Sequence, residues 1–480
     1  MKRYNIIYVL IALLAFFITS CSEDTMDSIN KDKNDALAVD AINELPAVEV
    51  ATAFGTTGTD LAWYSSVYIE HNAGTFGQLM TADERLQLQD GSLFDNNWNS
   101  IYNNLLALKD IREKCGKGGP EEFNVNILGI AQILTAHDLA IITDMWGQAP
   151  WTEALKGSQL KEPKYDKQSS IYAAIFQFLN EAITNLKNSI NNPNASQVRI
   201  GGNDYYYGGD ANKWIKAAWS LKARYFMRLE KVNSSAVDSV LVCVANGFQS
   251  ASDALVFTNY EDQAYGNQPW YQFLNDRGYL SASQTLANAM QDRKDTMRIN
   301  NYFLTNSSGE LAFAPNGTAV ESQQGDKYSI GVLENDPTFP TVIMSYHELL
   351  FLKAEAEARK GTNALTTLND AVKEAFGFWK ISYPQFDQYF TDNIAPKYTA
   401  DPLKEIMIQK WIAGYEIESI EAYNDYRRTE LLPLSNPKNN SNGFVWRLPF
   451  VASELSANSI NVPKVDVTKE KIWWAGGTEK

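Results

Sequence analysis

The sequence lacks the signals of a redox, metal-dependent or nucleic-acid-binding protein. Its 480 residues include three cysteines and three histidines, with no Cys-x-x-Cys pair and no His-Glu-x-x-His motif that would predict a zinc site. It has no P-loop and no Gly-x-Ser-x-Gly element. The 57 acidic residues outnumber the 42 basic ones, and no Lys/Arg-rich run appears. This composition argues against nucleic acid and anionic lipid as electrostatic partners. Because no catalytic motif is present, we expect no enzyme activity.

The N-terminus carries a processing signal. Lys2 and Arg3 precede an apolar run at residues 6–18. The run is too short for a membrane span, which needs about 20 apolar residues, and fits the apolar region of a signal peptide. It ends in Ile-Thr-Ser-Cys, which resembles a bacterial lipobox cut before Cys21. We therefore expect residues 1–20 to be a lipoprotein signal peptide and Cys21 to carry the lipid. The alternative is an ordinary signal peptide with an incidental cysteine.

The residues after Cys21 indicate a location and a tether. The acidic pair Glu23 and Asp24 resembles the export signal that carries lipoproteins of Bacteroidetes to the outside of the outer membrane. Residues 21–45 are mostly polar and charged, which predicts a flexible, lipidated tether. Residues 46–480 are expected to form the binding domain, held on the cell outer membrane and facing the exterior.

No cofactor is predicted. With Cys21 lipidated, Cys115 and Cys243 either pair or stay as two free, buried thiols, and we favour free thiols. Acid-rich loops near Asp253 and Asp262 could hold a structural Ca²⁺, but no EF-hand spacing supports one.

Apolar periodicity predicts a mostly helical chain. The expected helices cover residues 96–114, 125–147, 169–190, 213–230, 344–361, 364–376 and 402–426. One weak strand candidate is LAFAP at 311–315. Long irregular stretches are expected at 231–285, 300–340 and 427–480, and such long loops are uncommon unless they carry function.

The helices at 344–361 and 364–376 form the best candidate for a helix–turn–helix repeat. Ala354, Ala356 and Ala358 allow close packing, and Gly361 allows the turn. The pair resembles a tetratricopeptide repeat in length, without its full signature.

Several motifs in order carry a family resemblance. YYYGGDANKWIKAAWSLKARYFMRL supplies Gly208, Gly209, Asp210, Lys213, Trp214, Leu221, Arg224 and Arg228. DMWGQAPWTEAL begins at Asp144, HELLFLKAEAEARKG at His347, EAYNDYRRTELLPL at Glu421 and RLPFVASELSAN at Arg447. Together they resemble the SusD/RagB family, in its SusD-like group: nutrient-binding outer-membrane lipoproteins of Bacteroidetes. One departure is NKDKND in the tether, where the family often has Asn-x-Asp-Pro-Asn.

The resemblance implies a fold and a role. The fold would be mostly α, with four tetratricopeptide-like helix pairs in a right-handed superhelical scaffold and long irregular ligand-binding loops on one side. The lipoprotein would act as a lid on a SusC-type TonB-dependent outer-membrane transporter. The scaffold would contact that partner, and the loops would hold the nutrient.

Aromatic side chains in loops are the candidates for ligand binding, because aromatic rings pack against the C–H faces of sugars. These candidates are Trp63, Tyr64, Trp270, Tyr271, Trp379 and Tyr383. Aromatic residues on helical stripes are expected in the core: Trp98, Tyr102, Trp214 and Trp411. His71, His137 and His347 are each interpreted as structural.

Two ligand classes remain open. An oligosaccharide would need an aromatic platform. An oligopeptide, as the RagB branch of the family name allows, would need backbone-pairing groups and apolar pockets. The predicted loop tryptophans favour the oligosaccharide, and a purely structural lid is a third possibility.

Overall fold

The computed structural model describes residues 39–436 and 442–479, and the predicted signal peptide, Cys21 and most of the tether lie outside the described residues. Ala41–Lys480 forms one compact unit. Its first helix, α3 (Ala41–Ala51), packs against α6 and buries Leu45. Residues 41–45 therefore belong to the folded unit, and not to the tether predicted for them.

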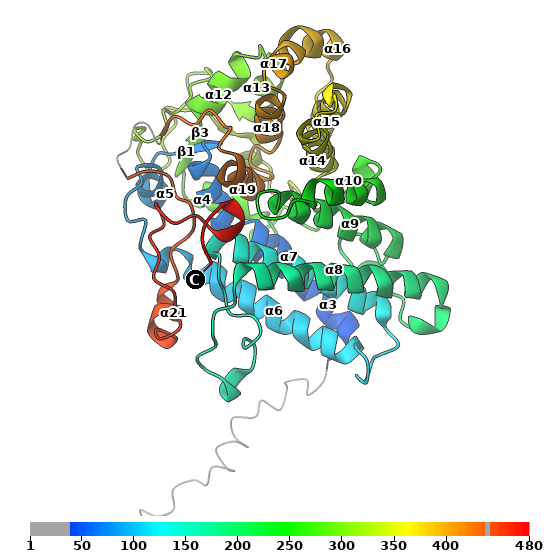
Figure 1. The fold of residues 1–480 in the computed structure, drawn as a ribbon. Helices are drawn as coiled ribbons and strands as arrows, with labels where there is room; N and C mark the ends of the chain where they lie inside the picture. Colours follow the sequence, from blue (N-terminus) through cyan, green and yellow to red (C-terminus); the bar gives the residue numbers. More distant parts are fainter. Residues whose placement is uncertain (1–38, 437–441, 480) are drawn as a thin grey trace, which may run out of the picture. The chain divides into compact units, whose positions relative to one another are not determined.

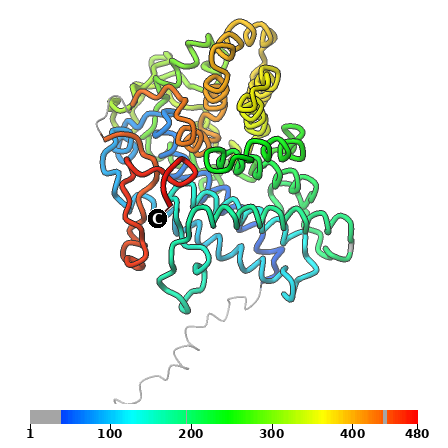
Figure 2. Tube along the Cα trace, viewed as in Figure 1, coloured from blue at the N-terminus to red at the C-terminus, as the bar shows by residue number. Residues whose placement is uncertain are grey.

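Long helices that follow one another in the chain pack side by side (Figures 1 and 2). They are α6 (Asp95–Cys115), α7 (Val125–Trp146), α8 (Gln168–Asn191), α9 (Ala211–Arg228), α10 (Ala236–Asn246), α14 (Tyr346–Arg359), α15 (Leu365–Phe378), α18 (Pro402–Ala413) and α19 (Ser419–Thr429). The contacts run from α6 through α7, α8, α9 and α10 to α14, which packs against α15 and α18. The predicted, mostly α architecture of packed helix pairs is confirmed.

The single long helix predicted for 402–426 is wrong. The chain breaks between α18 and α19, where Glu416 adopts a left-handed backbone conformation with φ 57°. Buried contacts hold this break. Asn72 donates to Glu416 at 3.2 Å, and the backbone N–H of Ser345 donates to Glu418 at 2.8 Å. Tertiary hydrogen bonds thus outweigh the helical pattern of the segment.

The shorter elements lie both inside and outside the stretches predicted to be irregular. The helices are α4 (Asp60–Tyr68), α5 (Gly77–Asp83), α11 (Pro269–Asp276), α12 (Gln284–Gln291), α13 (Thr296–Tyr302), α16 (Phe386–Tyr389), α17 (Ala395–Ala400) and α21 (Ala452–Ala457). Three antiparallel strand pairs are β1 (Asn72–Gly74) with β3 (Leu280–Ala282), β2 (Leu255–Phe257) with β6 (Thr341–Met344), and β4 (Phe303–Leu304) with β5 (Ile330–Gly331). The strand predicted at 311–315 is wrong, because only Ala314 makes an isolated bridge, to Ser283.

The core is built around α7. This helix is long and apolar enough to span a membrane, but 83% of its most apolar window is buried inside the protein. Trp98, Trp214 and Trp411 are buried as predicted, and Tyr102 is half-buried. Cys115 and Cys243 are likewise buried and free, as favoured from the sequence.

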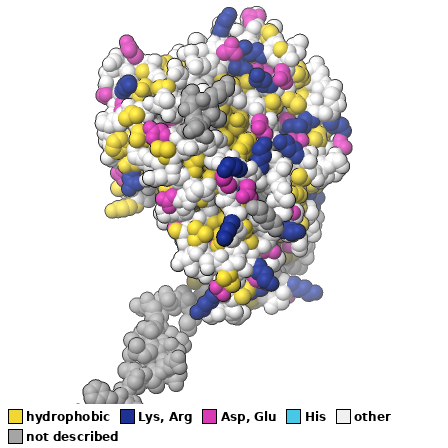
Figure 3. Space-filling view, turned by 60° about the vertical axis from the view of Figure 1, so that its left-hand side comes forward, with side chains coloured by type: hydrophobic (Ala, Val, Ile, Leu, Met, Phe, Trp, Pro, Cys, Tyr) yellow, Lys and Arg dark blue, Asp and Glu magenta, His cyan; other side chains and the backbone are white. Residues whose placement is uncertain are grey.

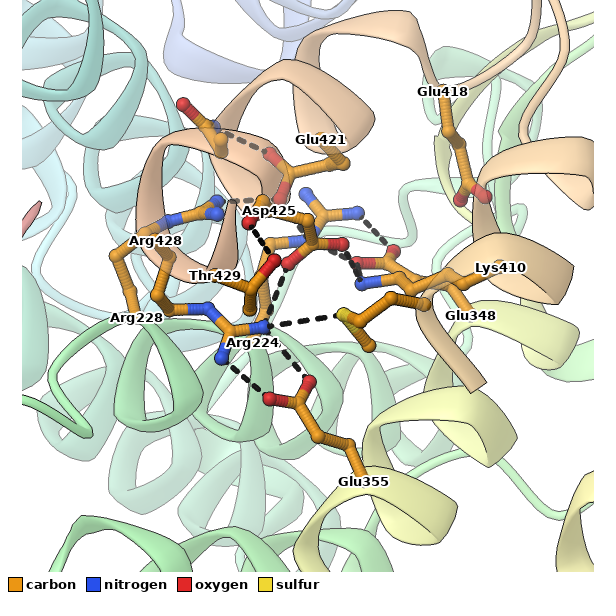
Figure 4. A network of polar contacts seen from close by, with 12 residues as sticks. Arg224, Arg228, Glu348, Glu355, Lys410, Glu418, Glu421, Asp425, Arg428 and Thr429 are labelled. Carbon is orange, nitrogen blue, oxygen red and sulfur yellow. Dashed lines mark hydrogen bonds and ion pairs between the residues drawn. The ribbon is translucent and has the colours of Figure 1, made fainter. Parts of the chain in front are cut away.

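A buried network of ion pairs joins four helices (Figure 4). Its members come from α9, α14, α18 and α19: Arg224, Arg228, Glu348, Glu355, Lys410, Glu421, Asp425 and Arg428. Burial alone would raise the pKa of Glu421, but the charges of Arg224 and Arg228 outweigh that effect and lower it to about 2. Glu421 therefore stays ionised, and its charge is balanced by cations of α9 and α18.

The glycine pair before α9 forms a turn and leads to a helix cap. Gly208 and Gly209 have φ of 62° and 83°, a region that glycine adopts without strain. Asp210 then accepts hydrogen bonds from the backbone N–H groups of Asn212 and Lys213, at 2.9 and 3.3 Å. The motif that carries the family resemblance here serves the fold, because these residues start and cap a core helix.

Candidate ligand-binding surface

The structure places four of the six predicted ligand contacts in helices. Trp63 and Tyr64 lie in α4 and are 7% and 2% exposed. Trp270 and Tyr271 lie in the first turn of α11, where Trp270 is buried and Tyr271 is half-buried. Their predicted place in loops is wrong. The sequence contains residues that are typical of helix starts at both places. Asp60 is the first residue of α4, Gln268 caps α11, and Pro269 is the first residue of α11.

An aromatic patch reaches the surface above α4 and α11. Trp63 stacks on Phe273, with ring centroids 3.9 Å apart and an interplanar angle of 22°. The edge of Phe273 meets Tyr279 at 5.8 Å, and Tyr279 lies 5.4 Å from Phe76. Trp63 and Phe273 are buried, whereas Phe76 and Tyr279 are partly exposed. The patch, defined as these four residues, thus has two rings open to a ligand and two beneath them.

The backbone at Gly77 helps to fix the outer rings. Gly77 has φ 55°, and a Cβ atom at this position would stand 2.8 Å from the ring of Tyr279. The ring therefore lies directly against the glycine backbone, and any other residue would displace it. Phe76 is the preceding residue, so one turn positions both exposed rings.

Polar groups surround the patch. Burial raises the pKa of Asp60 to about 6, although the nearby charge of Arg277 opposes the rise. Asn275, Asp276 and Arg277 are exposed at the end of α11. Amide, carboxylate and guanidinium groups next to aromatic rings are the chemistry that a hydroxylated ligand requires.

Three further exposed or partly exposed rings are not among the residues predicted from the sequence: Phe76, Tyr265 and Tyr279. Tyr265 is fully exposed on the loop before α11, which is closed by the Glu261 N–H donating to the Gly266 carbonyl at 2.8 Å. Each of these three aromatic residues has a glycine next to it in the sequence: after Phe76, after Tyr265 and before Tyr279. Such a glycine could have indicated an exposed ring, because glycine allows tight turns.

Trp379 and Tyr383 belong to two other groups of rings. Trp379 ends α15, is half-buried and lies 5.4 Å from Phe339 and 4.6 Å from Tyr302. Tyr383 lies 6.2 Å from Phe376 in a stacked arrangement. No ring contact among the described residues joins either group to the aromatic patch, so the six predicted residues do not form one platform.

The histidines lie in the interior. His71 shares a 2.7 Å hydrogen bond with the Trp411 carbonyl, and His137 shares one of 3.2 Å with Thr57. His347 lies 3.7 Å from Glu418. Burial lowers the pKa of each to about 3, which keeps all three neutral near pH 7. Within 39–436 and 442–479, no group of three or more His, Cys, Asp or Glu side chains is arranged to hold a metal ion.

A small cavity of about 30 Å³, lined by both apolar and polar side chains, lies behind α11. Trp270 and Gln268 line one side of it, and His137, Arg224 and Glu418 line another. Burial raises the pKa of Glu418 to about 8. The cavity is large enough for a water molecule or two and too small for a sugar ring, so it supports the surface rather than receiving the ligand.

The raised pKa of the buried Glu418 predicts that the free energy of unfolding declines above pH 6.5. The folded protein keeps a proton on Glu418 up to about pH 8, while the unfolded chain releases it near pH 4.5, so stability falls as pH rises between these values. Below about pH 6.5 the three buried histidines act in the opposite direction, since the unfolded chain then binds their protons.

Between pH 6.5 and 8, the unfolding free energy of the parent protein should fall as Glu418 loses its proton. In the Glu418→Gln variant, which has no proton to lose there, this fall should be smaller by roughly 2 kcal/mol. Urea titrations at both pH values measure it, with Glu310→Gln at an exposed position as the control. Equal pH slopes in the variant and the parent protein would contradict the prediction.

On the face drawn in Figure 3, basic and acidic side chains are interspersed, and apolar side chains are exposed between them. This mixed surface agrees with the composition, which predicts no electrostatic attraction to nucleic acid.

Comparison with known proteins identifies the family. A SusD-like family described as "Starch-binding associating with outer membrane" matches residues 65–450. The chain belongs to the SusD-like family. A SusD/RagB family protein of Bacteroides thetaiotaomicron is 34% identical, with a TM-score of 0.84 over 92% of this chain and 100% of that one.

More distant solved structures share the fold. A chitin-binding SusD homologue of Flavobacterium johnsoniae is 22% identical, with a TM-score of 0.76 over 90% of this chain and 98% of that one. A SusD homologue of Bacteroides uniformis is 20% identical, with a TM-score of 0.71 over 91% of this chain and all of that one. No curated protein matches the chain.

Proposed function

We propose that this SusD-like protein is a lipoprotein anchored through Cys21 to the outer membrane, where it faces the exterior and binds oligosaccharide. Its partner would be a SusC-type TonB-dependent transporter, on which it would act as a lid during nutrient import. The family's description as starch-binding and associating with the outer membrane supports the location and the ligand class. The protein would bind and not transform its ligand, and the family's description as starch-binding supports this role.

The aromatic patch is the observation that carries the ligand class. The partly exposed rings of Phe76 and Tyr279 offer flat apolar faces, and Asp60 and Arg277, from the start of α4 and the end of α11, would supply polar groups for the hydroxyls of a sugar. The buried rings of Trp63 and Phe273 hold the outer rings in place, so binding would not require the surface to be ordered first. A peptide remains the alternative ligand, and the same experiment decides between the two.

Replacing Tyr279 with alanine is expected to weaken oligosaccharide binding about tenfold, because a ring that contacts ligand contributes roughly 1–2 kcal/mol. The compact unit Ala41–Lys480 is first tested against arrays of plant, host and microbial glycans and against a peptide library. Affinity for the best ligand is then measured by titration calorimetry. Tyr346→Ala, which removes a partly exposed ring on α14, is the control. Peptide binding without glycan binding would overturn the proposed ligand class.

A further inference from the structure

A groove of about 470 Å³ runs between α3 and the first half of α6, on elements other than those of the aromatic patch. Ala47, Val48 and Ala51 of α3 form one wall. Asn99 and Asn103 of α6 lie on the other wall, together with Asn96. The volume falls within the roughly 300–1,000 Å³ that is usual for ligand sites.

The asparagines of α6 run against local helix propensity. The helix begins DNNWNSIYNN, and asparagine is a poor helix former. Two of its asparagines are explained by the fold. Asn97 donates to Thr59 at 3.2 Å, and Asn104 donates to Asp138 at 2.8 Å; both asparagines are buried.

The other three asparagines serve no contact within the fold. Asn96, Asn99 and Asn103 are exposed, and their side chains make no hydrogen bond with any residue that the structure describes. Residues that lower helix propensity and make no stabilising contact are expected at functional positions.

The three amides form a row. Their spacing of three and four residues puts them on one helix face, about 4.5 and 6 Å apart along the axis. Each amide offers two donors and one acceptor. Among the residues that the structure describes, no charged side chain lines the groove. The ligand that fits is neutral, rich in hydroxyl groups and long enough to bridge about 10 Å.

We propose that this groove is a second binding site for a neutral oligosaccharide. The proposal rests on the proposed function, because it assigns the same ligand class to a separate surface. A peptide fits less well, since the described residues that line the groove are Ala, Val, Ser and Asn and include no charged side chain to pair with a terminus. A chain that occupied both sites would be held at two points.

The test uses maltoheptaose and hexa-N-acetylchitohexaose as probes, titrated into Ala41–Lys480 by calorimetry and followed by NMR. The double variant Asn99→Ala/Asn103→Ala is expected to weaken one binding event about tenfold and to leave the event that depends on Tyr279 unchanged. The thermal midpoint should not fall, because alanine is the better helix former. Asn300→Ala, at an exposed asparagine of α13, is the matched control.

The outcomes separate this inference from the proposed function. Two events, one lost in Tyr279→Ala and the other in the double variant, would support both sites. A single event lost only in Tyr279→Ala would overturn the groove and leave the proposed function standing. A single event lost only in the double variant would support the groove and overturn the aromatic patch. Absence of binding to every neutral glycan, or peptide binding that depends on Asn99 and Asn103, would overturn the groove as an oligosaccharide site.

Discussion

Replacing Arg428 with alanine is expected to lower the free energy of unfolding by about 3–5 kcal/mol. Arg428 is fully buried and donates to Glu355 at 2.8 Å and to Asp425 at 2.9 Å. Its removal leaves two buried carboxylates short of a partner. Arg359 and Lys410 still contact them, at 2.7 Å each, which keeps the expected loss within this range. Urea unfolding at pH 7 measures the change.

A double-mutant cycle distinguishes the lost ion pair from lost packing. The variant Arg428→Met/Glu355→Met removes both charges, so it should cost less than the sum of the two single variants. Lys360→Ala, which breaks the exposed pair with Asp238, should change stability by less than about 1 kcal/mol. Additive costs in the cycle would show that the Arg428–Glu355 pair does not act as a unit.

The helices that sequence periodicity predicted well are those whose pattern and packing agree. α8 follows this rule, because its buried residues recur at helical spacing and both ends match the prediction within a residue or so. The segment at 402–426 shows the opposite case. Its pattern is helical throughout, yet the buried carboxylates of Glu416 and Glu418 find their donors only if the chain bends between α18 and α19. The donors, Asn72 and Ser345, lie far from this segment in the sequence, so its local pattern could not predict the bend.

The binding surface was harder to predict than the fold for the same reason. The motifs that identify the family place Arg224, Arg228 and Glu421 in the buried network, so they report the scaffold and not the ligand. In the sequence, the first turns of α4 and α11 resemble loops, so the criterion of aromatic residues in loops selects Trp63 and Trp270. It omits Phe76 and Tyr279, which the pairing of β1 with β3 brings together.

Trp63 offers the sharpest contrast between the prediction from sequence and the structure. The indole is 7% exposed and stacks 3.9 Å from Phe273, so Trp63→Ala is expected to cost about 3–5 kcal/mol of stability. Oligosaccharide affinity should fall as well, because Phe273 supports Tyr279. Trp63→Phe should cost less, since it keeps a ring and the buried indole N–H makes no hydrogen bond to the described residues.

Tyr279→Ala is the matched comparison, because it removes a ring that the structure leaves partly exposed. It should reduce affinity and leave the unfolding free energy within about 1 kcal/mol of the parent protein. Urea unfolding and calorimetric titration of the three variants measure both quantities. Loss of binding in Trp63→Ala at unchanged stability would mean that the indole contacts the ligand directly, as the sequence predicted. Loss of both together would place Trp63 beneath the site, where the structure has it, with the exposed rings making the contact.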